Sequence, residues 1–257
     1  MKKRWLFLLL CFCAGHLPAQ DWQGKKCAVV LTYDDALNVH LDNVVPALDS
    51  LGLRGSFYLT VSFPGFTARM NDWKKAAARH ELANHTLFHP CNGRAPGRSF
   101  VRKDYDLATY SVPRMQDELR LTNTVLQALD GRTERTFAYP CGDTEAGGVS
   151  YVDTLKSSFA GARGVVPALV PFRRTDLYRI GSVAVNGQSG PELIEWVKRA
   201  RAANSLVVFL FHGVGGEHSL NVSLEAHRML LRYLKENEDE VWNPTFLEAV
   251  KWLGRAQ

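Results

Sequence analysis

Short apolar runs alternate with amphipathic segments along most of this chain, and this alternation constrains the fold more than any other feature. Residues 27–33 are apolar and rich in β-branched side chains, as in a strand buried on both faces. Residues 55–61 and 206–211 are further strand-like runs. Residues 37–51 carry apolar side chains at helical spacing and end at Gly52. The pattern predicts an α/β fold with a mostly parallel sheet in one domain.

The rest of the chain continues this order. Further helices are expected at residues 71–79, 113–129, 151–159, 193–203, 224–237 and 245–253, and strands at 136–139 and irregularly up to 185. Residues 92–110 are polar, contain glycine and proline, and are expected to form a long loop. Because chemistry in such folds gathers at the carboxyl ends of the strands, the residues that follow each apolar run are the candidate functional residues.

The N-terminal residues form a separate segment. Basic residues at positions 2–4 precede an apolar run at 5–14, which is too short to span a bilayer, and Ala19 offers a cleavage point. This pattern predicts a signal peptide at residues 1–20 and a secreted or periplasmic domain at residues 21–257. A lipid anchor is less favoured, since a bulky leucine precedes the first cysteine. No other stretch approaches the ~18 apolar residues of a membrane span.

Loss of that segment changes the charge and the cysteine count. The formal net charge falls from +5 to +2 because three basic residues leave, and no basic run remains that favours nucleic acid as a partner. No protein partner is indicated. Cys27, Cys91 and Cys141 remain, so at most one internal disulfide is expected in an oxidising compartment. Cys91 and Cys141 lie beside two of the motifs described below and can pair if those motifs converge.

Two adjacent carboxylates, Asp34 and Asp35, directly follow the first strand. Like charges at the end of a buried strand need a countercharge, such as a metal ion. One of them can instead cap a helix that starts at Ala36, but a cap accounts for only one carboxylate.

His85 and His89 are four residues apart, and this spacing predicts two imidazoles on one face of a helical turn, within reach of one ion. An isolated pair at this spacing is more often simply hydrogen-bonded or exposed. With Asp35, however, the pair forms a set of two histidines and one carboxylate with open coordination positions. Such a set suits a hydrolytic zinc or a non-haem iron.

Two other strand ends carry candidate residues. Residues 137–142 read as a strand that ends in a Pro/Gly turn, which by itself is no functional signal. His212 follows the strand at residues 206–211, where it is either a satisfied core residue or a general acid.

In their order and contexts, these four segments resemble the motifs of the polysaccharide deacetylase family, the NodB-like carbohydrate esterases. Thr-Tyr-Asp-Asp at residues 32–35 resembles the family's TFDD motif, and residues 80–89 resemble its double-histidine motif. Residues 137–142 are similar to a variant of the third motif and residues 210–212 to the last one. The resemblance extends over roughly residues 25–253.

This resemblance implies an irregular (β/α) barrel with fewer than eight strands. It implies one divalent metal ion held by Asp35, His85 and His89, most often Zn²⁺, with Co²⁺, Ni²⁺ or Fe²⁺ as alternatives. Asp34 is then the general base and His212 the general acid. The implied reaction is the hydrolysis of an N- or O-linked acetyl group on an oligo- or polysaccharide.

The resemblance also implies that Tyr139 and Cys141 contact the substrate or its oxyanion, the latter through the backbone N–H of Cys141, because proline at 140 has none. Two positions depart from the family pattern. Ala138 stands where an arginine usually pairs with the base, and Arg179 is the predicted substitute. The Asp and Trp pair that tunes the acid histidine has no clear match, and Asp176 is its predicted counterpart by position alone.

Other functions fit part of this pattern. They are hydrolysis of a small non-glycan amide, carbohydrate binding without turnover, and oxygenation by an iron held on the same ligands. Several aromatic residues in expected loops either stack on sugar rings or pack their own loops: Phe63, Phe66, Trp73, Tyr105 and Tyr110. His218 follows two glycines and is left without a role.

Overall fold

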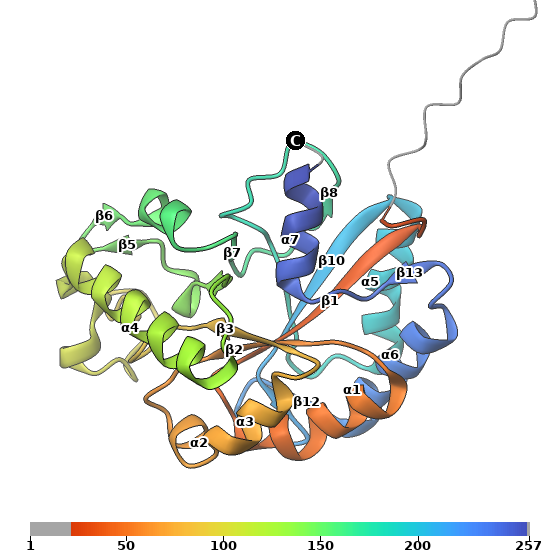
Figure 1. Ribbon diagram of the computed structural model, residues 1–257, viewed down its shortest axis with the longest axis horizontal. Coiled ribbons are helices and arrows are strands. Elements are labelled where there is room, and N and C mark those ends of the chain that lie inside the picture. The colour runs from red at the N-terminus through yellow and green to blue at the C-terminus, as the bar shows by residue number, and fades with distance from the viewer. Residues whose placement is uncertain (1–21, 256–257) are drawn as a thin grey trace, which may run out of the picture.

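A computed structural model describes residues 22–255, so the predicted signal peptide lies outside the described residues. The centre of the fold is a curled sheet with the strand order β7-β4-β3-β2-β1-β10-β8 (Figure 1). Each pairing along this path is parallel except that of β8 with β10. The predicted α/β fold, an irregular barrel with a mostly parallel sheet, is confirmed. The strands are β1 (Cys27–Asp34), β2 (Ser56–Leu59), β3 (Glu81–Asn84), β4 (Phe137–Ala138), β7 (Ala162–Arg163), β8 (Leu169–Pro171) and β10 (Ser205–Phe211).

Six further strands of two residues each complete the described part of the chain. In the main sheet, β13 (Val241–Trp242) pairs with β1 and β9 (Val183–Ala184) with β10. Two small separate pairs are β5 (Glu145–Ala146) with β6 (Val149–Ser150), and β11 (Gly213–Val214) with β12 (Asn221–Val222).

Apart from a short helix at residues 64–67, which was not predicted, the helices lie close to their predicted positions. They are α1 (Val45–Leu51), α2 (Pro64–Thr67), α3 (Met70–Ala76), α4 (Val112–Asp130), α5 (Gly190–Ala202), α6 (Leu224–Glu236) and α7 (Phe246–Arg255). The helix expected at residues 37–51 is divided into a π-helical turn (His40–Val44) and α1, which carries a proline in its first turn, where a missing N–H is tolerated. The helix expected at 151–159 is a 3₁₀ segment (Val152–Ser157).

Alternate residues of β1 enter two apolar layers, as the two-residue period of a strand requires. Val29, Leu31 and Tyr33 pack on the face covered by α1, α5 and α6. Ala28 and Val30 pack on the opposite face with α7 (Figure 1). The sheet is therefore buried on both faces, which explains why β1 and β10 are apolar along nearly their whole length.

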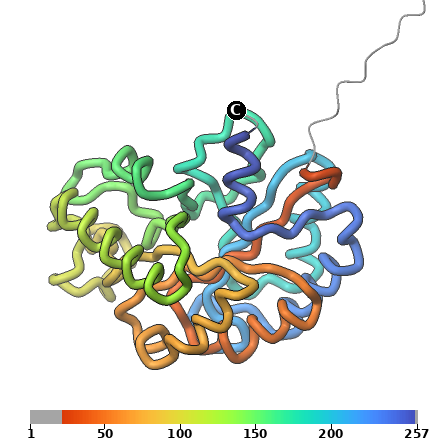
Figure 2. Tube along the Cα trace, viewed as in Figure 1, coloured from red at the N-terminus to blue at the C-terminus, as the bar shows by residue number. Residues whose placement is uncertain are grey.

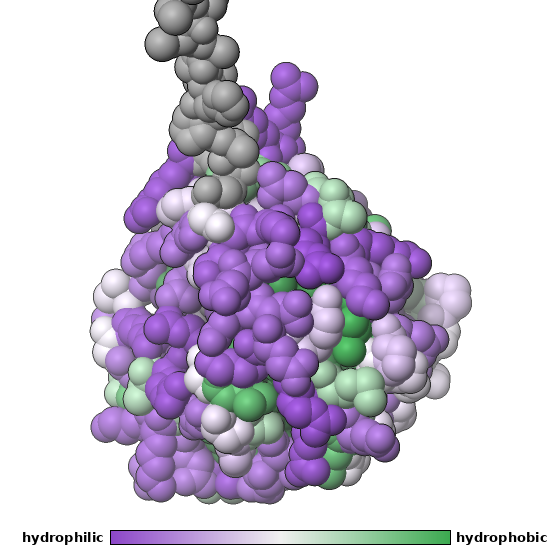
Figure 3. All heavy atoms as spheres, turned by 90° about the vertical axis from the view of Figure 1, so that its right-hand side faces the viewer, coloured by the Kyte–Doolittle hydropathy of each residue, from purple (hydrophilic) through white to green (hydrophobic). Residues whose placement is uncertain are grey.

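The described chain begins and ends at the same edge of the molecule, the upper edge in Figure 2. The side turned toward the viewer in Figure 3 is mostly polar, with small separate apolar patches. Among the described helices, none combines the length and apolar character needed to cross a bilayer.

The parallel strands β1, β3, β4 and β10 direct their carboxyl ends to one edge of the sheet. The four segments with candidate functional residues follow these four strands. The fold thus gathers at one place residues that are far apart in the sequence.

Candidate active site

Three predicted metal ligands converge at this edge. Oδ1 of Asp35 lies 3.5 Å from Nε2 of His85 and 3.4 Å from Nε2 of His89. One ligand atom from each residue lies within 4.8 Å of the other two. Oδ1 of Asp35 is buried and has no hydrogen-bond partner within the described residues. A buried, unpartnered carboxylate oxygen facing two imidazole nitrogens fits a divalent cation.

The protonation states also suit metal binding. The carbonyl oxygen of Ala138 accepts a hydrogen bond from Nδ1 of His85 at 2.9 Å, which leaves Nε2 of the neutral ring with a free lone pair. Burial lowers the pKa of His85 to about 4, so the ring is neutral near pH 7. Burial tends to raise the pKa of Asp35, but four nearby imidazoles, those of His89, His85, His212 and His218, hold it at about 2.

The two histidines do not lie on a helical turn, so that prediction is wrong. His85 directly follows β3, and the backbone then takes left-handed φ angles at Thr86 (69°) and His89 (55°). Asn84 Oδ1 accepts from the N–H of Thr86 at 2.8 Å, and Thr86 Oγ1 accepts from the N–H of His89 at 2.8 Å. These side-chain hydrogen bonds replace those of a helix. They hold the backbone so that the rings of His85 and His89 both face Asp35.

Asp34 is paired with an arginine that the sequence did not indicate. Nη2 of Arg163 lies 2.7 Å from Oδ1 and 2.5 Å from Oδ2 of Asp34, and the guanidinium lies over the ring of Tyr58 at 5.0 Å. The Arg163 side chain is fully buried. It lies on β7 directly opposite Ala138 of β4 in the strand register. The family resemblance led us to expect an arginine at position 138. The arginine that pairs with Asp34 instead lies on the neighbouring strand, at the position opposite Ala138.

The predictions for Arg179 and Asp176 are wrong. Nε of Arg179 faces Oδ2 of Asp176 at 3.7 Å, and both side chains are more than half exposed. Among the described residues, Arg179 and Asp176 form no hydrogen bond or ion pair with Asp34 or His212. The sequence signal for the true partner was weak, since Arg163 is a single charge in a two-residue strand.

Two imidazoles lie on the opposite side of Asp35. Nε2 of His212 and Nε2 of His218 are each 3.9 Å from Oδ2 of Asp35, and their rings stack at 4.7 Å. Burial lowers the pKa of His212, while the carboxylates of Asp34 and Asp35 oppose that shift. Nδ1 of His212 is buried without a partner in the described part of the chain. The sequence around His218 indicates only a turn, because two glycines precede it, and no pattern there points to a role.

Tyr139 and Cys141 differ in their surroundings. Tyr139 packs in an apolar cluster, its hydroxyl donates to the carbonyl of Tyr178 at 2.8 Å, and its N–H donates to the carbonyl of Arg163 at 3.1 Å. Both polar hydrogens of Tyr139 are thus engaged within the fold, and its contact with substrate stays a prediction. Cys141 has a left-handed φ of 55° in the turn beyond β4.

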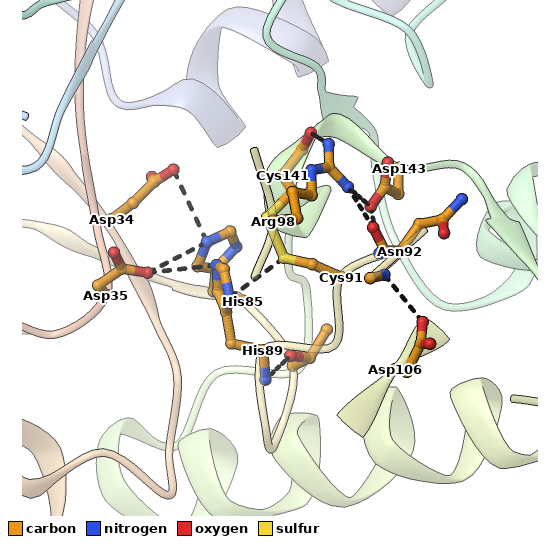
Figure 4. Close-up of a disulfide and its surroundings, with 12 residues drawn as sticks. Asp34, Asp35, His85, His89, Cys91, Asn92, Arg98, Asp106, Cys141 and Asp143 are labelled. Atoms are coloured by element: carbon orange, nitrogen blue, oxygen red, sulfur yellow. Dashed lines mark hydrogen bonds and ion pairs between the residues drawn. A yellow bond between two sulfur atoms is a disulfide. The ribbon is translucent and has the colours of Figure 1, made fainter. Parts of the chain in front are cut away.

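A disulfide joins the second and third motifs. Cys91 and Cys141 are bonded, with their Cα atoms 5.8 Å apart, and Sγ of Cys91 lies 3.6 Å from Nδ1 of His89 (Figure 4). The predicted convergence of the two thiols is thus observed. Cys27 is a buried free thiol in β1, as expected. The bridge holds the turn of Cys141 close to a metal-ligand candidate.

Comparisons with known proteins identify a family for part of the chain and related folds for most of it. The family model described as polysaccharide deacetylase matches residues 22–156, just over half of the chain. No curated protein sequence matches significantly.

Several solved structures share the fold. A protein from Mycobacterium smegmatis assigned to the polysaccharide deacetylases has a TM-score of 0.61 and 12% identity, over 90% of this chain and 91% of that one. A CE4 family pseudoenzyme from Bacillus anthracis has a TM-score of 0.55 and 20% identity, over 88% and 66%. The catalytic domain of a peptidoglycan N-acetylglucosamine deacetylase from Eubacterium rectale has a TM-score of 0.53 and 15% identity, over 86% and 89%. At these identities the likeness establishes the fold alone.

Proposed function

Because the chain belongs to the polysaccharide deacetylase family, we propose that it is a metal-dependent hydrolase that removes acetyl groups, N- or O-linked, from a carbohydrate. Membership of the family supports the carbohydrate deacetylase activity. One observation carries the metal dependence and the residue roles: chemically suited side chains surround a single buried, unpartnered oxygen, Oδ1 of Asp35.

Asp35, His85 and His89 would hold a divalent ion, and Zn²⁺ is the first choice for two imidazoles and a carboxylate. An ion bound there would lower the pKa of a coordinated water and polarise the acetyl carbonyl. The other residues of the site orient the catalytic groups and transfer protons.

Asp34 is proposed as the general base. Its carboxylate is 3.8 Å from Nε2 of His85, so it lies beside the metal ligands without being needed as one. Arg163 contacts both its oxygens, balances its charge and fixes its direction. Asp34 then accepts the proton of the attacking water.

His212 is proposed as the general acid. Its Nε2 lies 3.9 Å from Oδ2 of Asp35, and it would protonate the departing amine or alcohol. The backbone N–H of Cys141 would donate to the oxyanion of the tetrahedral intermediate.

The direct test measures acetate release by metal-loaded protein from N-acetylated chitooligosaccharides and from acetylated xylan. We expect release with zinc or cobalt, and a fall of kcat of about 10²- to 10⁴-fold in Asp34→Asn, with zinc content unchanged, because only the proton acceptor is lost. Asp117→Asn, the same change in an exposed ion pair with Arg120 on α4, is the matched control expected to retain activity. Failure of every acetylated substrate to release acetate would contradict the proposal.

A second candidate function is hydrolysis of a small non-glycan amide. It is favoured by the altered third motif at Ala138 and by the unpartnered Nδ1 of His212. Comparing linear and cyclic amides with glycans, on the same protein, separates the two. Turnover of amides alone would favour this second function.

Secretion is also proposed, from the pattern at residues 1–20. The disulfide supports an oxidising compartment. N-terminal sequencing of the protein recovered outside the cytoplasm tests it, and a mature chain that still begins at residue 1 would contradict it.

A further inference from the structure

His212, the proposed general acid, lies at a point where the regular pairing of the sheet is interrupted. The pairing of β10 with β1 ends at Phe211, and the short strand β11 begins at Gly213. The carbonyl oxygen of His212 is half-buried between these two pairings, where a backbone acceptor needs a donor from elsewhere. The choice of that donor sets the orientation of the peptide that follows His212.

The donor is the imidazole of His40. Its Nε2 donates to the carbonyl oxygen of His212 at 2.8 Å, so this nitrogen carries the proton. Burial lowers the pKa of His40 to about 4, and the ring is therefore neutral near pH 7, with a lone pair on Nδ1. Nδ1 is buried and has no hydrogen-bond partner within the described residues.

An imidazole is a costly choice for this position. His40 is fully buried, and its ring lies against the aromatic rings of Tyr33 and Phe57, with centroids 5.6 and 6.0 Å away. The ring satisfies one polar atom, the carbonyl oxygen of His212, but leaves its own Nδ1 unpaired. Because an unpaired buried nitrogen destabilises a protein about as much as one hydrogen bond stabilises it, the net gain in stability is small. What the imidazole adds is direction at His212.

The backbone at His40 gives a second, independent indication. Residues His40–Val44 form a π-helical turn, in which the N–H of Val45 donates to the carbonyl of His40, five residues earlier. Such turns are rare and occur frequently at functional sites. Here the turn begins at the residue whose side chain contacts the proposed acid.

Further hydrogen bonds join the same two segments. Nδ2 of Asn43 donates to the carbonyl of Val214 at 2.8 Å. The N–H of Val39 donates to Oε2 of Glu217 at 2.7 Å. Together with the imidazole contact, the two segments are thus joined at three points, and the loop that follows β10 is held on one side along its length.

We propose that His40 is a positioning residue, whose neutral ring holds the backbone of His212 so that the imidazole of His212 stays directed at the leaving group. His40 follows Asp34 and Asp35 closely in the chain, so the same contact ties the proposed acid to the proposed base. His40 supports His212 in place of Asp176, and it does so through the backbone. This inference rests on the proposed function, in which His212 protonates the departing group.

The test uses two substrates that differ in their need for an acid. Hydrolysis of N-acetylated chitotetraose requires protonation of a departing amine, whereas para-nitrophenyl acetate releases a stable phenolate without it. We expect His40→Phe to lower kcat for the tetrasaccharide about 10- to 100-fold, the effect of a displaced catalytic group. For the aryl ester kcat falls less than about threefold, and the zinc content is unchanged.

His227→Phe is the matched control. His227 is also a buried histidine, but its Nε2 contacts the hydroxyl of Tyr33 at 2.9 Å. The same substitution there removes a buried hydrogen bond of the same kind, and the ratio of the two kcat values stays that of the wild type. His40→Gln restores most of the ratio, because its amide N–H also donates to a carbonyl.

An equal fall of both kcat values in His40→Phe, or no recovery in His40→Gln, would overturn the positioning role while the proposed function stood. If His40→Phe does not fold, Asn43→Ala tests the same contact between segments. It shifts the ratio about two- to fivefold in the same direction, and an unchanged ratio counts against the inference.

If the wild type releases no acetate, the proposed function fails, and amide hydrogen exchange of residues 212–217 still decides the inference. Exchange that is at least about tenfold faster in His40→Phe than in His227→Phe supports the positioning of this loop by His40. Equal exchange in the two variants rules it out.

Discussion

The two halves of the active site are built in different ways. On one half, Asp34 and Arg163 lie on strands of the sheet, fully or almost fully buried, and are positioned by backbone pairing. On the other half, His89 and Cys141 lie in turns with left-handed φ angles. These turns are held by side-chain hydrogen bonds and a disulfide instead. In the strand half, the arginine that pairs with Asp34 can lie on either of two neighbouring strands. The loop half depends on side-chain hydrogen bonds and a disulfide between segments.

The largest expected effect comes from removing the residue at which the two halves meet. His85 follows a strand, but its Nε2 faces Asp35 and its ring lies 4.8 Å from that of His89. We expect His85→Ala to lose the proposed zinc and at least about 10³-fold of kcat/KM, because ligand and water activation are lost together. Elemental analysis and acetate release measure both.

The matched control is His227→Gln, a buried histidine that hydrogen-bonds Tyr33 away from the centre. It should keep one equivalent of zinc. Full zinc content in His85→Ala would contradict the assignment of the triad.

The next largest effect tests the strand half. Arg163→Met leaves the carboxylate of Asp34 buried without a countercharge, so we expect a loss of about 3–5 kcal/mol in the free energy of unfolding. Arg179→Met, in an exposed pair, is the matched control and should change it by less than about 1 kcal/mol. Urea unfolding measures both variants.

The strand register allows a sharper version of this test. Because Ala138 lies directly opposite Arg163, the double variant Ala138→Arg with Arg163→Ala returns a guanidinium to the neighbouring strand. We expect it to recover part of the stability and activity lost in Arg163→Ala alone. No recovery would show that the two positions are not interchangeable, and that the strand half is as specific as the loop half.

A smaller effect on catalysis is expected from opening the loop half. Cys91→Ser with Cys141→Ser removes the link beside His89, and we expect activity to fall about 10- to 100-fold, as for other groups that support a metal ligand. The free energy of unfolding should fall by about 2–4 kcal/mol, since the bridge closes a long loop with a sequence separation of 50. Cys27→Ser is the control without a disulfide.

Reduction by dithiothreitol should reproduce the loss in the wild type and have no effect on the double serine variant. Wild-type activity that is insensitive to reduction would show that hydrogen bonds alone hold the loop half in place.

Local sequence determined the strands β1, β2, β4 and β10, most helices and the candidate residues that follow strands. Apolar, β-branched runs such as β1 and β10 are recognisable because their burial on both faces requires apolar side chains throughout. Asp34, Asp35, His85 and His212 stood out because polar residues directly after such runs need a reason to be there. Their gathering at one edge follows from parallel pairing, which the alternation of strands and helices already indicated.

The tertiary structure decided what those residues contact. Asp34 is paired with Arg163, 129 positions away, and no local pattern marks a partner on another strand. Tyr139 belongs to the core, because its hydroxyl and its N–H find partners in segments that only the sheet brings near. The left-handed turn at Thr86 and His89 and the position of His218 likewise depend on contacts between distant segments. Sequence patterns report burial and local geometry, whereas the pairing of buried charges depends on which strands become neighbours.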